Sequence, residues 1–104
     1  MLFKKDLIDL ILEGKKTMTS RDKLLNKVGE VTNLMANRDY SKISGKKIKI
    51  TKVYKKSLNE FTDNDANKEG FENIVEFKQY WKKNIGEWKT SIVVWIHEFE
   101  VLSI

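Results

Sequence analysis

The segment "SIVVWIHEFEV", residues 91–101, constrains the fold more than any other part of the chain. At its centre apolar residues follow one another, so both faces of an extended chain there are apolar. Strands buried on both faces have this composition, whereas a strand with one face in water alternates apolar and polar residues. The segment therefore predicts a strand in the middle of a sheet or barrel wall.

A second strand is predicted at "KIKITKVY", residues 47–54. Ile48, Ile50 and Tyr54 would share one face, and Lys49 and Thr51 would lie on the other. Val53 interrupts this alternation, which predicts either partial cover of both faces or a bulge.

Three segments have helical patterns. Apolar residues at helical spacing predict a helix over residues 4–13, and Gly14 is a natural residue to follow its end. "TDND", residues 62–65, has the spacing of a capping box and predicts a short helix over residues 63–69. A third helix is predicted over residues 74–83.

The remaining segments complete a simple order of elements. Residues 15–21 and 30–35 are predicted to be extended, and residues 22–29 and 36–47 to be loops. The order is helix, strand, strand, strand, helix, helix, strand, which has too few helices for a doubly wound parallel sheet. We expect one α+β domain over residues 1–104, a small and mostly antiparallel β-barrel with helices capping its ends.

The amino-acid composition limits the kinds of functional site and partner that we expect. The chain has no cysteine and one histidine, so disulfides are excluded and a typical zinc site is not expected; a reducing cytoplasm fits. Residues 1–60 contain 15 basic and 7 acidic residues, a net charge of +8, and residues 61–104 contain 5 and 8, a net charge of −3. This asymmetry predicts a polyanion-facing side, although a lysine-rich solvated surface would have the same composition. No signal peptide or membrane span is recognised, and no membrane partner is expected.

Most sequence motifs of catalysis and cofactor binding do not occur. The sequence contains neither the phosphate-binding glycine patterns of nucleotide folds nor a G-x-S-x-G nucleophile elbow. HExxH and EF-hand patterns are also missing from it. His97 lies within the predicted strand of residues 91–101 and is expected to be a packed histidine rather than a triad member. We therefore expect no cofactor and no metal.

The stretch "EGKKTMTSRD", residues 13–22, is the remaining candidate site. Clustered lysine, arginine and hydroxyl side chains offer many donors to phosphate or carbonyl oxygens. A lysine beside Arg21 in a partly dry cleft could act as a base and activate a threonine hydroxyl as nucleophile. The alternative is a solvated turn, with its cations favoured by the C-terminal end of a helix dipole.

The same stretch resembles the G-x-K-x-x-[ET]-x-R signature of the ASCH domain family, which has a PUA-like β-barrel fold. The segments "GEVTNLMAN", "KIKITKVYKKSLNEFTDNDANKEGFENIVEFKQYW" and "VVWIHEFEV" are similar to archaeal-type members, in order and at similar spacing. The resemblance therefore covers nearly the whole chain. It implies binding or modification of RNA.

The resemblance also implies roles for particular residues. One bacterial branch of the family hydrolyses N-acetylated cytidine with a lysine and a threonine of K-T-x-T-x-R-D and a later glutamate. These would be Lys16, Thr19 and Glu69, the last in "ANKE", residues 66–69. Lys16 and Thr19 would face opposite sides of a regular strand, so both reach one cleft only if the chain bends after Gly14.

Two functions from different classes follow, and both use the same cleft. The first is an RNA- or nucleoside-binding domain, whose expected ligand-binding residues are Lys15, Lys16, Thr17, Arg21 and Trp88. The second is a small amidohydrolase acting on an acylated pyrimidine nucleoside through the three catalytic residues named above. Ribonuclease activity is a third possibility, which the lack of a histidine pair makes less attractive.

Overall fold

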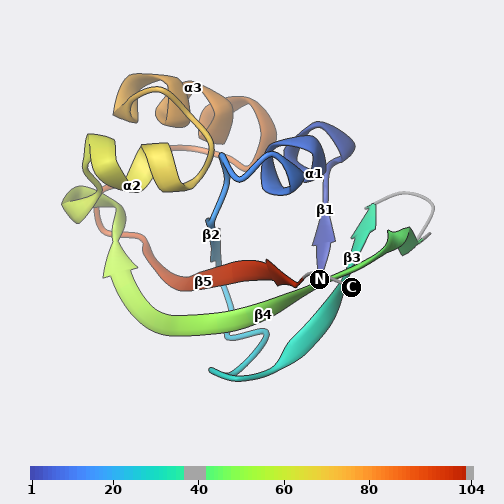
Figure 1. Ribbon diagram of the computed structural model, residues 1–104. Coiled ribbons are helices and arrows are strands. Elements are labelled where there is room, and N and C mark those ends of the chain that lie inside the picture. The colour runs from blue at the N-terminus through green and yellow to red at the C-terminus, as the bar shows by residue number, and fades with distance from the viewer. Residues whose placement is uncertain (37–41, 103–104) are drawn as a thin grey trace.

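The computed structural model describes the backbone of residues 1–36 and 42–102 and the side chains of residues 1–35 and 46–102. Figure 1 shows its elements, which follow the predicted order with two additions, a short first strand and a short 3-10 helix. The strand predicted over residues 47–54 is also longer than expected. The elements are β1 (Leu2–Phe3), α1 (Lys5–Leu12), β2 (Met18–Arg21), β3 (Val31–Ala36), β4 (Lys42–Ser57), η1 (Leu58–Glu60), α2 (Asp63–Lys68), α3 (Ile74–Asn84) and β5 (Val93–Leu102).

The five strands form one curled sheet in the order β1-β3-β4-β5-β2. β1 pairs with β3 in parallel, and the other three pairings are antiparallel. β5 lies between β4 and β2, which confirms the prediction of an interior strand. The expected fold class is also confirmed, because an open, half-barrel sheet packs with helices in an α+β arrangement (Figure 1).

Both faces of β5 are covered, as its apolar sequence predicts. Phe99 packs with Ile8 and Ile11 of α1, whereas Ile96 packs in a second cluster with Phe77 of α3. Phe99 and Ile96 are three residues apart on one strand, so they project from opposite faces of the sheet. The sheet therefore has α1 against one face and the α2–α3 pair against the other.

The long strand β4 corrects one expectation. Residues 42–46 of the expected loop belong to β4, and residues 37–41 of that loop lie outside the described residues. Pairing with β3, where Lys42 lies opposite Met35, outweighs the local turn propensity of this glycine- and serine-containing segment. The register with β5 shifts between Ile50 and Lys52, so the irregularity lies about one residue before the position that Val53 suggested.

The helices begin and end close to the predicted positions. The capping box is present: the Thr62 side chain accepts a hydrogen bond from the Asp65 N–H, and the Asp65 carboxylate accepts one from the Thr62 N–H. Gly14 follows α1 with φ of 79°, a conformation that favours glycine. No helix in the described part of the chain is long and apolar enough to cross a membrane.

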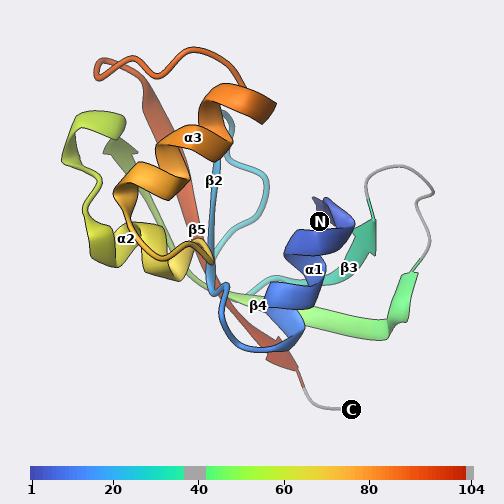
Figure 2. The ribbon, with the colours of Figure 1, turned by 90° about the horizontal axis from the view of Figure 1, so that it is seen from above.

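The two outer strands of the sheet, β1 and β2, are linked by a side chain. The Arg21 guanidinium of β2 donates from Nη2 to the Leu2 carbonyl of β1 at 2.7 Å, and it lies 4.9 Å from the centre of the Phe3 ring. Figure 2 shows the view from above, with α1 on one side of β2, α2 on the other, and α3 crossing over the strand. The open side of the half-barrel is therefore bridged beside the helices.

Candidate functional site

A cavity of about 260 Å³ lies against the outer edge of β2, between α1 and α3. Its lining combines an apolar and aromatic wall with a few charged and hydroxyl groups, which is the usual composition of a small-molecule site. The charged residues in its lining are Lys4, Lys16, Arg21 and Glu69, so the site has an excess of two positive charges. The hydroxyl groups come from Thr19, Ser20 and Tyr80.

The turn after α1 places Lys16 at this cavity. The N–H groups of Lys15 and Lys16 both donate to the Leu10 carbonyl, at 2.9 and 3.1 Å, so the chain turns directly after Gly14. Lys16 consequently precedes β2, and the alternation of a regular strand does not apply to it. Its side chain is 3% exposed, and Nζ donates to the Met18 carbonyl at 2.8 Å.

Glu69 meets Lys16 from the other side. The Lys16 Nζ lies 2.8 Å from the Glu69 Oε1 and 3.2 Å from the Glu69 carbonyl oxygen. The second carboxylate oxygen, Oε2, accepts a hydrogen bond from the Ser20 hydroxyl. The Glu69 side chain is 4% exposed, so this is a buried ion pair with each carboxylate oxygen bonded to a different donor.

Gly70 allows this close approach. It has φ of 102°, and a Cβ atom there would lie 3.0 Å from the Leu10 Cδ1 and 3.3 Å from the Lys16 Cβ. Any other residue would therefore be strained in backbone conformation and crowded against the lysine. The glycine following Glu69 is a requirement of the site geometry.

Thr19 lies in the same cavity but in a different hydrogen-bond group. Its Oγ1 accepts a hydrogen bond from the Arg21 Nε at 3.3 Å, and its residue is 5% exposed. Burial lowers the pKa of Arg21, and the negative charge of Glu69 partly offsets this effect. Among the described residues, no hydrogen bond joins Thr19 to Lys16 or Glu69.

Aromatic side chains form the opposite wall. Phe71 and Tyr80 lie with ring centres 5.1 Å apart, and Phe77 packs edge-on against Trp81 at 6.2 Å. Burial, followed by the negative charges of Asp6 and Glu69, raises the pKa of the Tyr80 hydroxyl, so it remains a neutral hydrogen-bond donor at physiological pH. These flat surfaces suit a planar ring.

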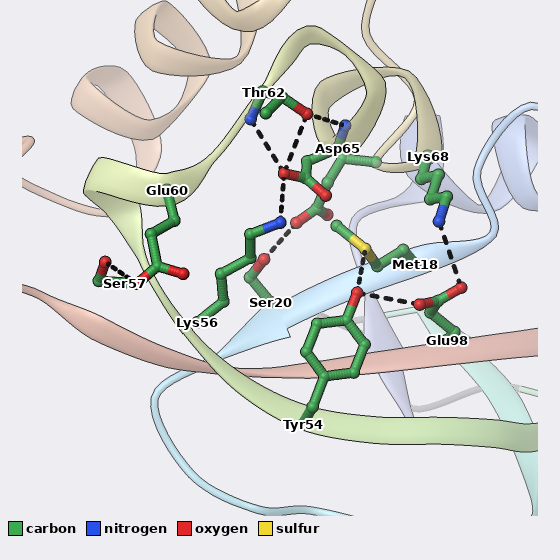
Figure 3. A network of polar contacts seen from close by, with 11 residues as sticks. Met18, Ser20, Tyr54, Lys56, Ser57, Glu60, Thr62, Asp65, Lys68 and Glu98 are labelled. Carbon is green, nitrogen blue, oxygen red and sulfur yellow. Dashed lines mark hydrogen bonds and ion pairs between the residues drawn. The ribbon is translucent and has the colours of Figure 1, made fainter.

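A polar network outside the cavity holds α2 in place (Figure 3). Lys56 donates to the Asp65 carboxylate at 2.8 Å, and the Tyr54 hydroxyl donates to Glu98 at 2.9 Å. Burial of Asp65 raises its pKa, but the hydrogen bonds from Lys56 and Thr62 outweigh burial and hold the pKa below its usual value. Asp65 is in α2, which Glu69 follows as its C-terminal cap, so the bonds of Asp65 to Lys56 and Thr62 help to fix the backbone from which Glu69 projects.

His97 is packed, as expected. It is fully buried, and its Nε2 accepts a hydrogen bond from the Leu25 N–H at 3.2 Å, which fixes the ring proton on Nδ1. Burial and the nearby charge of Arg21 lower the pKa of His97, an effect that outweighs the neighbouring carbonyls of Trp95 and Thr19. A neutral histidine of this kind supports the loop that contains Leu25.

The structure brings together Lys16, Thr19, Arg21 and Glu69 of the predicted site residues. The others lie elsewhere. The Lys15 ammonium is exposed and lies 3.1 Å from the Glu13 carboxylate. Thr17 joins the backbones of α2 and β5, through its N–H to the Lys68 carbonyl and its carbonyl to the Phe99 N–H. Trp88 is half-buried against Phe61, Phe77 and Trp81, outside the lining of the cavity.

Sequence reasoning missed Ser20 and the aromatic wall. The sequence could have identified Ser20 as a site residue, because it lies between Thr19 and Arg21 in the candidate motif. It could not have identified Tyr80, because a tyrosine in a short amphipathic helix is most often part of the core. Within residues 1–36 and 42–102, histidine and carboxylate side chains form no cluster of three that could bind a metal.

The chain is similar in fold to solved structures of low sequence identity. The ASCH domain from Lactobacillus crispatus JV V101 has 21% identity and a TM-score of 0.69, over 92% of this chain and 70% of that chain. Protein EF3133 from Enterococcus faecalis V583 has 20% identity and a TM-score of 0.68, over 93% and 67%. A mutant of the ZmASCH protein from Zymomonas mobilis has 17% identity and a TM-score of 0.65, over 96% and 66%.

Comparison of this sequence with curated proteins finds no match. The family model described as the ASCH domain matches residues 1–103. That match extends from β1 through β5 and includes the Lys16–Glu69 pair and the cavity beside it. The chain therefore belongs to the ASCH domain family.

Proposed function

We propose that the cavity beside β2 binds a nucleoside, either free or as an unpaired nucleotide of RNA. The observation that carries the proposal is the pairing of an aromatic wall with a positively charged opposite wall in one cavity of about 260 Å³. A base stacks on aromatic side chains, and cationic groups favour phosphate. The ASCH family is generally linked to RNA binding, which supports the same class of ligand.

The size of the cavity favours one nucleotide unit over a long stretch of backbone. A groove that follows several phosphates would need charged residues along an extended surface, whereas here the charges converge on one concave site. Glu69, the one carboxylate that the described residues contribute to the lining, can accept hydrogen bonds from an exocyclic amino group. Cytidine and adenosine carry such a group, so they are the first ligands to test.

Calorimetric titration with cytidine and adenosine tests this proposal, followed by single-stranded RNA at about 50 and 200 mM salt. We expect saturable nucleoside binding, and RNA binding that weakens at the higher salt concentration. Tyr80→Leu should weaken binding about 5- to 150-fold, because loss of one stacking partner costs about 1–3 kcal/mol. Tyr54→Leu is the matched control, because Tyr54 lies outside the cavity lining.

No nucleoside binding to folded protein, or equal loss in the two tyrosine variants, would contradict the proposal. Circular dichroism on both variants separates loss of binding from loss of fold. RNA binding without nucleoside binding would place the ligand on another surface.

A second function, amide hydrolysis of an N-acylated pyrimidine nucleoside, is favoured by one specific observation. The ion pair of Lys16 and Glu69 puts a carboxylate, which can accept a proton, in the same cavity as two hydroxyl groups of β2, and the lysine ammonium lies 2.8 Å from that carboxylate. Such a carboxylate can take the proton of a hydroxyl or a water that attacks the amide carbonyl, and can then pass that proton to the leaving nitrogen. Arg21, a cation in the lining of the same cavity, would stabilise negative charge on the carbonyl oxygen.

Incubation with N-acetylcytidine, followed by chromatography for cytidine, tests this second function. We expect turnover by the unaltered chain and its loss in Glu69→Gln, which keeps the shape of the side chain. Lys15→Met provides a control for changes of charge, because Lys15 lies outside the cavity. Equal turnover by Glu69→Gln and the unaltered chain would refute this function.

A further inference from the structure

Ser20 has a contact that the resemblance to the amidohydrolase branch does not assign. Its hydroxyl donates to the Glu69 Oε2, while the Lys16 ammonium donates to the Glu69 Oε1. The three side chains thus form a continuous hydrogen-bonded line from ammonium to carboxylate to hydroxyl. Ser20 also lines the cavity and is less buried than Thr19.

Thr19 lacks the contacts that a nucleophile needs. Its Oγ1 accepts a hydrogen bond from the Arg21 guanidinium, and an acceptor bond to a cation withdraws electron density from the oxygen. A hydroxyl becomes nucleophilic when its own proton is taken by a base within hydrogen-bond reach. Among the residues that the structure describes, the Glu69 carboxylate meets that condition for Ser20 and not for Thr19.

We propose that Ser20 is the nucleophilic hydroxyl of this site and that it forms an acyl-ester intermediate, with Glu69 as its base and Thr19 as a residue that positions Arg21. The inference rests on the second proposed function, acyl transfer from nitrogen. It narrows the substrate class to compounds whose acyl carbon reaches the Ser20 Oγ while their ring lies on the aromatic wall.

Glu69 carries the proton through each chemical step. The Ser20 Oγ bonds to the acyl carbon while the Ser20 proton moves to the Glu69 Oε2. The C–N bond then breaks, and the proton on Glu69 passes to the leaving nitrogen, so the amine leaves neutral. Water attacks the acyl ester and gives one proton back through Glu69 to the Ser20 oxygen, which releases the carboxylic acid and restores the site.

An activated ester that carries no nucleoside, p-nitrophenyl acetate, tests the inference. The protein is mixed with the ester, quenched in acid at times within and after the first turnover, and mapped by tandem mass spectrometry. Lysine acetylation resists hydroxylamine, and the chain has no cysteine and one histidine, so a hydroxylamine-labile acetyl group mapped to a residue other than His97 marks a hydroxyl side chain. We expect a labile acetyl group on Ser20 at close to one per chain.

Variants make the assignment decisive. Ser20→Ala and Glu69→Gln should lose the labile label, whereas Thr19→Val should retain it, although more slowly if Arg21 shifts. A labile label on Thr19, or no labile label on Ser20 at any quench time, would overturn the inference. Circular dichroism of each variant confirms that loss of label reflects chemistry, and retention in Thr19→Val is a positive result that a misfolded site cannot give.

This result is independent of the nucleoside assays. A chain that binds or deacylates nucleosides but carries no label on Ser20 retains the proposed function and contradicts the role of Ser20. A chain labelled at Ser20 that neither binds cytidine nor hydrolyses N-acetylcytidine has the nucleophile but acts on a different acyl compound.

Discussion

The buried ion pair of Lys16 and Glu69 makes the sharpest prediction about stability. Lys16→Met keeps most of the length of the side chain and removes its charge, which leaves the Glu69 carboxylate at 4% exposure without its partner. The change also removes hydrogen bonds to two backbone carbonyls, of Met18 and Glu69. Loss of one partner of a buried pair costs about 3–5 kcal/mol, so this variant should lose much of the stability of a small domain.

The double variant Lys16→Met with Glu69→Gln should recover part of that loss. It buries no unpaired charge, and the Gln side chain can still accept a hydrogen bond from the Ser20 hydroxyl. We expect it to be about 1–3 kcal/mol more stable than Lys16→Met alone, because the penalty of the orphaned carboxylate is removed. Urea unfolding followed by fluorescence of the three tryptophans measures each free energy of unfolding.

Lys15→Met is the matched control. The same substitution one residue away removes an exposed ammonium whose side chain is 66% accessible, so its effect should stay within about 0.5 kcal/mol. If Lys16→Met costs as little as Lys15→Met, or if the double variant is no more stable than Lys16→Met, the pair is not buried and coupled as the structure describes.

The remaining predictions test the support of the site. Gly70→Ala should lower the free energy of unfolding by about 1–3 kcal/mol more than Gly29→Ala does. Both glycines have positive φ, but only a Cβ at position 70 would meet a neighbour, the Leu10 Cδ1 at 3.0 Å. Urea unfolding of the two variants measures the difference, and equal losses would contradict the close packing. Because the pKa of His97 is lowered in the folded chain, the unfolded chain binds the proton more readily, and stability should fall as the pH drops through about 6.5. The free energy of unfolding should be lower at pH 5.5 than at pH 7.5, and the difference should be smaller in His97→Leu than in the unaltered chain. The same difference in both proteins would show that other groups cause the pH dependence. Arg21→Met should lower the free energy of unfolding by about 2 kcal/mol, because it removes the charge-assisted hydrogen bond to the Leu2 carbonyl. A loss below about 0.5 kcal/mol in the same assay would show that this bond between β1 and β2 does not contribute to stability.

Local patterns in the sequence determined the elements and much of their arrangement. The periodicity of residues 4–13 and the capping box at Thr62 are short-range signals, since the contacts within a helix join residues three or four positions apart. The apolar run at residues 91–101 predicted an interior strand because both of its faces had to be covered. The motif at residues 13–22 likewise indicated where a site lies, because its donor groups are adjacent in the chain.

The composition of the site was decided only by the tertiary structure. The Lys16–Glu69 contact joins residues 53 positions apart, and its geometry depends on a turn after α1 and on the end of α2. Ser20 became a partner of Glu69 through the same packing, whereas Lys15, one residue from Lys16, points to solvent. Sequence spacing specifies which side chains are near each other along one element, but which elements meet, and which hydroxyl faces the carboxylate, depends on how both faces of the curled sheet are covered.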